Sequence, residues 1–279
     1  MTETTEQPKV AGRIIAFFDI HNAYLALKEL IEKIKPTKDD LLIFHGDYVD
    51  GWNDTKRTID YLMELKRLYN CKFIMGNHDS MWGLLGFLRT GTPERAWLQH
   101  GGIPTYDCIK AEMEDNPEWI DEVSEFFSDL LPYYLDEENR LFIHGGFSSN
   151  KGVKCYEDNS TFFDAQWDFM WDRTLVTRTL ESRVLAVEKP ARLDLYKEVY
   201  VGHTATMTLE ASLIYNGIEV PPFDFTKPLI MGKLIAGDTG AGWNGKLSAI
   251  EVNTKEIWQS STVRDLYKEI DKEHYARVS

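Results

Sequence analysis

The stretch Leu41-Leu-Ile-Phe-His-Gly-Asp-Tyr-Val-Asp50 joins a short apolar run to a turn that carries two carboxylates. Its first four residues have the length and apolar character of a buried strand. Residues 14–18 and 72–75 are further short apolar runs that end in polar turns, and residues 23–35 and 54–68 between them repeat apolar side chains at helical spacing. This alternation of strand and helix predicts a parallel sheet.

The rest of the chain continues the mixed pattern. Asn116 and Pro117 mark the start of a helix whose apolar residues recur at i, i+3 and i+4 up to residue 130. Residues 141–143 and 199–201 are expected strands, and the runs 229–235 and 247–252 flank a glycine-rich turn without a helical pattern, which predicts antiparallel pairing. We therefore expect one mixed α/β domain over residues 11–279, preceded by a flexible leader, residues 1–10.

Composition excludes several classes of protein. Of the 279 residues, 31 are Lys or Arg and 45 are Asp or Glu, which gives a formal net charge of -14. Such an acidic surface repels the nucleic-acid backbone, so no general nucleic-acid binding is expected. No run approaches the ~18 apolar residues of a membrane span, and we expect no membrane partner. The three cysteines, in no CxxC spacing, indicate a reducing compartment, and the polar leader favours a cytoplasmic location.

Polar side chains follow five of the expected strands at the point where each strand ends. In open α/β sheets, ligands bind in the crevice beyond the carboxyl ends of the strands, so five turns that are far apart in sequence are expected to form one pocket. The turns are Asp19-Ile-His21, His45-Gly-Asp47-Tyr-Val-Asp50, Gly76-Asn77-His78-Asp79, His144-Gly-Gly146 and Gly202-His203-Thr204.

The donors in these turns are carboxylates, an amide and imidazoles, without a thiolate. Such donors suit Mn, Fe or Zn better than copper or an iron–sulfur cluster. They are too many for one tetrahedral ion, and two cations ~3.5–4 Å apart need a bridging carboxylate, for which Asp47 is placed in the middle of the set. An isolated Asp or His at a strand end is more often a cap, but the recurrence in five turns favours a metal site. His45, His100 and His274 are interpreted as ordinary histidines.

Read in order, the five turns resemble the calcineurin-like metallophosphoesterase superfamily. Within it they are most similar to the phosphoprotein phosphatase family, including its bacterial, phage and diadenosine-tetraphosphatase-like branches. The family pattern GDxHG, GDxxDRG, GNHD/E, HGG or HAG and GHT reads FDIHN, GDYVDGW, GNHDS, HGGF and GHTAT in this chain. Asp238-Thr-Gly-Ala241 and Trp171-Asp-Arg173 are also similar to family elements, so the resemblance spans nearly the whole chain. It implies a mixed-sheet β-sandwich flanked by helices.

The resemblance also implies a role for each matched residue. Asp19, His21 and Asp47 would hold one divalent metal ion, and Asp47, Asn77, His144 and His203 would hold the second. Asp50 would orient His78, which would donate a proton to the leaving oxygen. Asn77 and Arg173 would contact the phosphate. A hydroxide activated by the metals would then hydrolyse a phosphate monoester, with Mn favoured and Fe or Zn as alternatives.

Three departures from the family pattern bear on the substrate. Phe18 and Asn22 replace both glycines that flank Asp-x-His, and Gly51-Trp52 stands where the family has Arg-Gly. The missing arginine normally grips the phosphate with two hydrogen bonds. Arg173 is therefore expected to act alone or together with a substitute, which could be Arg57, Arg89 or Arg95. Trp52 is either a stacking surface for an aromatic substrate or a side chain packed at the pocket edge.

The prediction is a metal-dependent phosphatase whose partner is a phosphorylated substrate. Phosphoproteins are the favoured substrate class. A nucleotide or dinucleoside-polyphosphate hydrolase is the alternative enzyme, supported by GNHD in place of GNHE and by Trp52. A binding protein of the same fold without metal is the alternative outside the enzymes, and the complete ligand set argues against it.

Overall fold

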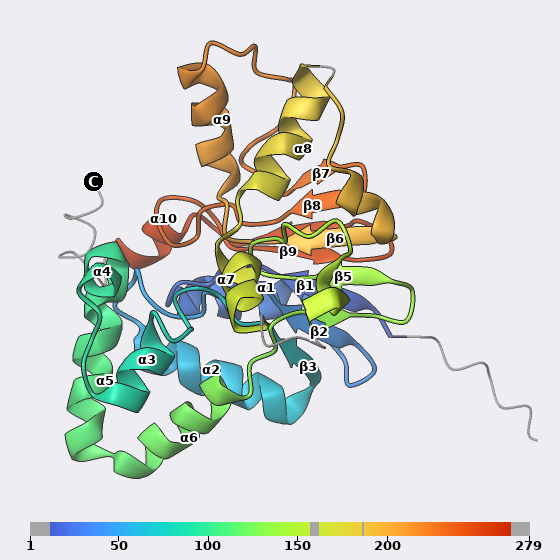
Figure 1. The fold of residues 1–279 in the computed structure, drawn as a ribbon. Helices are drawn as coiled ribbons and strands as arrows, with labels where there is room; N and C mark the ends of the chain where they lie inside the picture. Colours follow the sequence, from blue (N-terminus) through green and yellow to red (C-terminus); the bar gives the residue numbers. More distant parts are fainter. Residues whose placement is uncertain (1–11, 157–161, 186, 269–279) are drawn as a thin grey trace, which may run out of the picture.

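A computed structural model describes residues 12–156, 162–185 and 187–268. Two five-stranded mixed sheets form the centre of the molecule (Figure 1). The first sheet has the order β10 (Ile257–Gln259), β9 (Ser248–Glu251), β1 (Ile14–Phe17), β2 (Leu41–Phe44) and β3 (Asn70–Phe73). The second has the order β4 (Tyr134–Leu135), β5 (Arg140–Phe142), β6 (Glu198–Val201), β8 (Leu234–Ala236) and β7 (Leu229–Met231).

The two sheets pack face to face through a small apolar core. Side chains of both sheets contribute to it, and the central ones are large: Phe142 and Tyr200 stack with ring centroids 4.8 Å apart. The members of this core are Ala16, Phe18, Ile43, Ile74, Phe142, Tyr200, Ile235, Ile250 and Val252. The predicted sandwich of mixed sheets is therefore confirmed.

Helices cover the outer face of each sheet. Those on the first sheet are α1 (Tyr24–Ile34), α2 (Thr55–Leu68), α3 (Leu84–Thr90), α5 (Ile103–Asp115), α6 (Pro117–Ser128) and α10 (Val263–Tyr267). A short helix α4 (Arg95–Trp97) and the turn η1 (Leu98–Gly102) lead into α5. On the second sheet lie α7 (Phe162–Trp171), α8 (Thr174–Val184) and α9 (Thr206–Tyr215), with the 3-10 turns η2 (Val153–Tyr156) and η3 (Ala191–Leu195). Figure 1 shows α8 and α9 projecting from the sandwich.

The helices follow from the apolar spacing. In α1 the side chains of Leu27, Leu30, Ile31 and Ile34 are buried on one face, and the helix ends at Lys35, whose backbone is left-handed and precedes Pro36. Helix α6 begins at Pro117 as expected and buries Trp119, Val123 and Phe127.

Strand pairing confirms most of the predicted topology. β1, β2 and β3 are parallel, and so are β5 and β6. Antiparallel pairing holds for β7 with β8 and for β9 with β1 and β10. The expectation of an antiparallel C-terminal part is wrong in two respects. The runs 229–235 and 247–252 lie in different sheets, and β8 runs parallel to β6 because α9 and the following loop carry the chain back across the sheet.

No helix in the described part of the chain is long and apolar enough to span a membrane. The predicted leader, residues 1–10, lies outside the described residues, as does His274.

Candidate active site

The turns that follow the parallel strands meet at one end of the sandwich and enclose a cavity of about 410 Å³. Its lining comes from segments that are far apart in the sequence. Among the lining residues are His21, Asp47, Asn77, His78, Arg173 and His203. The crevice predicted beyond the carboxyl ends of the strands is therefore present, and four of the five expected turns contribute lining residues. The turn that begins at His144 contributes none, and both His144 and Asp19 are buried.

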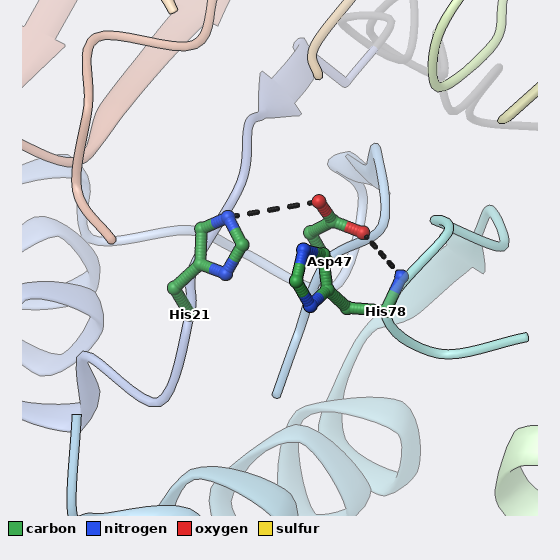
Figure 2. A group of neighbouring side chains, drawn as sticks. All are labelled: His21, Asp47 and His78. Carbon is green, nitrogen blue, oxygen red and sulfur yellow. Dashed lines mark hydrogen bonds and ion pairs between the residues drawn. The ribbon is translucent and has the colours of Figure 1, made fainter. Parts of the chain in front are cut away.

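Asp47 lies at the centre of the converging side chains (Figure 2). Its Oδ2 is 3.6 Å from Nε2 of His21, and its Oδ1 is 3.4 Å from Nε2 of His144. Two groups of donors therefore share Asp47: one contains His21 and His78, and the other contains His144 and His203. Within each group the donor atoms lie within 4.8 Å of one another, a spacing at which one cation can contact all of them.

Backbone carbonyl groups fix the orientation of two of these imidazoles. The Nδ1 atom of His144 donates to the carbonyl oxygen of His45 at 2.6 Å, and Nδ1 of His21 lies 3.3 Å from the carbonyl oxygen of Val49. When Nδ1 carries the proton, Nε2 has a free lone pair. In both residues Nε2 faces Asp47. His144 Nε2 also lies 3.1 Å from Oδ1 of Asn77.

Asp19 and His203 each bury a polar atom that has no hydrogen-bond partner. Oδ1 of Asp19 accepts the backbone N–H of His203 at 2.8 Å, whereas Oδ2 of Asp19 and Nε2 of His203 are unpartnered. Buried polar atoms are rarely left unpaired, because desolvation costs free energy that only a hydrogen bond or a cation can offset. Both atoms therefore fit the donor set of a cation site.

Burial and neighbouring charges shift the pKa values of several groups in the site. Burial and the charge of Asp238 hold the pKa of Asp19 well above its usual range. Burial lowers the pKa of His21 to about 4 and that of His203 well below its usual value, so both imidazoles are neutral and can offer a lone pair. A divalent cation would satisfy the carboxylates and these neutral imidazoles together.

His78 forms a close pair with Asp50 beside this group. Nδ1 of His78 donates to Oδ2 of Asp50 at 2.6 Å, as predicted. The backbone N–H of His78 donates to Oδ1 of Asp47 at 3.0 Å (Figure 2). Burial alone would lower the pKa of His78, but the charge of Asp47 and the hydrogen bond to Asp50 raise it to about 9. His78 also belongs to one of the two donor groups around Asp47, a grouping that the sequence did not suggest.

Asp79 is a residue of the site that sequence reasoning missed. Its fully buried carboxylate accepts the backbone N–H groups of Asp47 at 2.7 Å, Gly76 at 2.9 Å and Tyr48 at 2.9 Å. These bonds tie the turn after β2 to the turn after β3. Gly76 is required at this junction, because a Cβ there would lie 2.2 Å from Oδ1 of Asp47. The sequence feature that could have indicated this role is the aspartate that ends the GNHD motif.

The backbone of the site is unusual. Asp47, Asp50 and His203 have φ values of 51°, 73° and 62°, which side chains other than glycine rarely adopt. Asn22 has φ of 58°, and it replaces a family glycine at low cost because asparagine tolerates the left-handed region. Its Nδ2 donates to the carbonyl oxygen of Trp52 at 2.9 Å, which links the first two turns.

Arg173 is the one arginine among the described residues that lines the cavity. Its Nη1 donates to the carbonyl oxygen of His203 at 2.8 Å. The three alternatives lie elsewhere: Arg57 makes two hydrogen bonds of 2.6 Å to Asp54, Arg89 contacts the sulfur of Met81, and Arg95 does not line the cavity.

Trp52 cannot stack on a substrate, because it is fully buried. Its ring stacks on Tyr267 with centroids 5.1 Å apart, and its Nε1 donates to the carbonyl oxygen of Ala241 at 2.8 Å. Other tryptophans instead reach the cavity: Trp82, Trp171 and Trp243, of which Trp243 is 51 % exposed.

Three further residues change the sequence interpretation. Asp238 lines the cavity and is buried, although only its motif was singled out. His100, which belongs to none of the five turns, also lines the cavity. His45 stays outside the cavity but supports the site through its carbonyl group, and its ring stacks on Phe18.

Comparison with known proteins agrees with this geometry. The family model of the calcineurin-like phosphoesterases matches residues 12–205. No curated protein matches the chain with significant similarity.

Several solved structures share the fold at low sequence identity. A serine/threonine phosphatase from Saccharomyces cerevisiae is 13% identical, with a TM-score of 0.55, over 91% of this chain and 81% of that one. A metallophosphoesterase from Sphaerobacter thermophilus is 13% identical, with a TM-score of 0.52, over 95% and 98% of the two chains. A protein named as a candidate diadenosine tetraphosphatase is 17% identical, with a TM-score of 0.50, over 91% and 95%.

Proposed function

The chain belongs to the calcineurin-like phosphoesterase family and is a metal-dependent hydrolase, and from this premise we propose that it hydrolyses phosphate monoesters with two divalent cations that share Asp47. One observation carries the proposal. The two carboxylate oxygens of Asp47 face different histidines, Oδ2 toward His21 and Oδ1 toward His144. A carboxylate with one oxygen on each side is the ligand that two adjacent cations need.

The residues present fit two cations. Asp19, His21 and Asp47 would hold the first, and Asp47, Asn77, His144 and His203 the second. The unpartnered Oδ2 of Asp19 and Nε2 of His203 support a role for both residues as cation ligands. The donors are oxygen and imidazole nitrogen only, which favours Mn, with Fe or Zn as alternatives. When bound, such cations activate a water molecule and neutralise phosphoryl charge.

The chain's own residues supply the remaining steps. Arg173 lines the cavity with its guanidinium anchored on a backbone carbonyl, so it can hold a phosphoryl oxygen in place. His78, paired with Asp50, would donate a proton from Nε2 to the leaving oxygen. Asp50 fixes the tautomer in which Nδ1 carries the other proton.

Phosphorylated proteins are the favoured substrate class, because the family resemblance is strongest to phosphoprotein phosphatases. A nucleotide or dinucleoside polyphosphate is the second candidate. The observation in its favour is the half-exposed Trp243 on the cavity wall, which offers a ring for stacking, whereas Trp52 is fully buried and offers none. A cytoplasmic location stays a prediction from the sequence alone.

Measuring metal content and phosphatase activity on the same samples tests the two-metal proposal. We expect about two divalent ions per chain after loading with Mn, loss of phosphatase activity on exhaustive chelation, and recovery with Mn. A panel of phosphopeptides, nucleotides and dinucleoside polyphosphates assigns the substrate class. Full activity in excess chelator would reject the two-metal proposal, and metal binding without hydrolysis of any substrate would favour a binding protein.

A further inference from the structure

Trp97 is a buried residue that contacts Asp50, although it belongs to none of the predicted motifs. It is fully buried, and its indole Nε1 donates a hydrogen bond of 2.6 Å to Oδ2 of Asp50. The same oxygen accepts Nδ1 of His78 at 2.6 Å. Oδ1 of Asp50 is buried without a hydrogen-bond partner. The carboxylate is therefore held by two donors through one oxygen.

The segment that carries Trp97 contacts the Asp50–Gly51 turn at three points. Besides the indole, the carbonyl oxygen of Gly101 accepts the backbone N–H of Gly51 at 3.0 Å. The hydroxyl of Thr105 accepts the backbone N–H of Asp50, also at 3.0 Å. Asp50 has φ of 73°, a conformation that needs support from its surroundings. α4, η1 and the start of α5 together supply that support.

Gly102 lets the indole take this position. A Cβ at residue 102 would lie 2.7 Å from Nε1 of Trp97, closer than packed atoms approach. The ring of Trp97 therefore lies directly on the backbone of Gly102. The indole cannot shift toward Gly102, so the direction of its N–H bond toward Asp50 is well defined.

We propose that Trp97 is a positioning residue that holds the Asp50 carboxylate in the orientation His78 requires. The inference rests on the proposed function, in which a water oxygen releases a proton to solvent and bonds to phosphorus while the P–O bond to the leaving group breaks, its electron pair passing to the leaving oxygen. That oxygen takes the proton from Nε2 of His78. Without the indole, Oδ2 of Asp50 loses one of its two donors and the carboxylate can rotate. Nδ1 of His78 then no longer has an acceptor in a fixed position.

The chain provides a matched control for this contact. Nε1 of Trp119 donates to Oδ1 of Asp60, also at 2.6 Å, and neither residue lines the cavity. Trp97→Phe and Trp119→Phe therefore remove the same kind of hydrogen bond and leave an aromatic ring in place. A difference in kinetics between the two variants therefore arises from where the hydrogen bond lies, because both variants lose one indole hydrogen bond.

The experiment compares two substrates on the metal-loaded enzyme. With an alkyl phosphate, whose leaving group needs the proton, Trp97→Phe should lower kcat about tenfold. With p-nitrophenyl phosphate, the fall should be less than about threefold, because the leaving group departs as an anion. KM and metal content should stay near wild type, and Trp119→Phe should change neither rate.

Coupling to Asp50 separates positioning from packing. In an Asp50→Ala background, Trp97→Phe should cause no further loss, because the acceptor of the indole N–H is gone. Additive losses, or equal losses for both esters, would overturn the proposal. If Trp97→Phe fails to fold, Gly102→Ala decides the matter, because it displaces the indole without removing it and should produce the same substrate dependence.

The controls also distinguish this inference from the proposed function. If His78→Asn leaves alkyl phosphate hydrolysis unchanged, the proton-transfer role of His78 is wrong. If His78→Asn slows that reaction but Trp97→Phe and Gly102→Ala do not, only the role of Trp97 is rejected.

Discussion

The carboxylate of Asp79 holds the backbone of Asp47, the residue on which both donor groups converge, through a hydrogen bond of 2.7 Å. The two residues belong to different strand-end turns, and Asp79 also accepts N–H groups of Gly76 and Tyr48. Asp47 has a left-handed backbone, which the carboxylate of Asp79 stabilises by pairing with the amide that the turn exposes. Asp79 therefore helps to fix the position of the carboxylate that both donor groups share.

Asp79→Asn should destabilise the fold and weaken metal binding. An amide offers one acceptor oxygen and one donor group, so it cannot accept all three N–H groups. We expect a loss of about 2–3 kcal/mol in the free energy of unfolding and at least a tenfold loss of metal affinity. Urea denaturation and metal titration measure both. Asp60→Asn is the control, and wild-type values in Asp79→Asn would contradict the role.

Asp47→Asn should reduce binding at both proposed cation sites, whereas Asp19→Asn should affect mainly one. A neutral amide bridges two cations poorly because it carries no negative charge to offset theirs. Elemental analysis after loading with Mn should give less than one ion per chain for Asp47→Asn and about one for Asp19→Asn. Equal and undiminished content in both variants would remove Asp47 from the bridging role.

Arg173→Ala should raise KM and lower kcat together, each by about tenfold, because the guanidinium would contact the phosphoryl group before and during the reaction. Arg89→Ala is a matched control outside the cavity and should behave as wild type. Steady-state kinetics with one phosphate monoester measures both constants. Unchanged kinetics in Arg173→Ala would mean that the substrate is held without arginine.

His78→Asn distinguishes a general acid from a metal ligand. As a general acid, its loss should lower kcat about 100-fold or more for an alkyl phosphate and much less for p-nitrophenyl phosphate, with metal content unchanged. Asp50→Asn should show a weaker form of the same pattern. His78 lies in one donor group with His21 and Asp47, so loss of a metal ion in His78→Asn would assign it as a ligand instead.

Asp40 should make stability depend on pH. Burial would raise the pKa of Asp40, but hydrogen bonds from Arg13 and Thr37 outweigh it and hold this pKa below its usual value. Its stabilisation is then present above the unfolded pKa, about 3.9, and is lost as the pH falls through the folded pKa. Asp40→Asn should cost about 1–3 kcal/mol at pH 7.

Urea denaturation across pH tests this assignment. The difference in unfolding free energy between wild type and Asp40→Asn should shrink below about pH 4. A difference that stays constant with pH would contradict the role of the Asp40 carboxylate.

The sequence by itself determined the first three strands, the helices α1, α2 and α6, and the order of the polar turns. Apolar periodicity is local, so the alternation from residue 14 to residue 75 predicted the parallel β1, β2 and β3. Because parallel strands end at the same sheet edge, the sequence also predicted that Asp47, Asn77 and His78 would meet. The chemistry of the donors followed from residue type alone.

Only the tertiary structure decided which side chains support that chemistry. Trp97 reaches Asp50 across 47 positions through a turn that has no apolar periodicity to reveal it. Trp52 is buried against Tyr267, and Arg57 is paired with Asp54, so neither reaches the cavity. The direction of a side chain depends on long-range packing between loops, and that packing leaves no local pattern in the sequence.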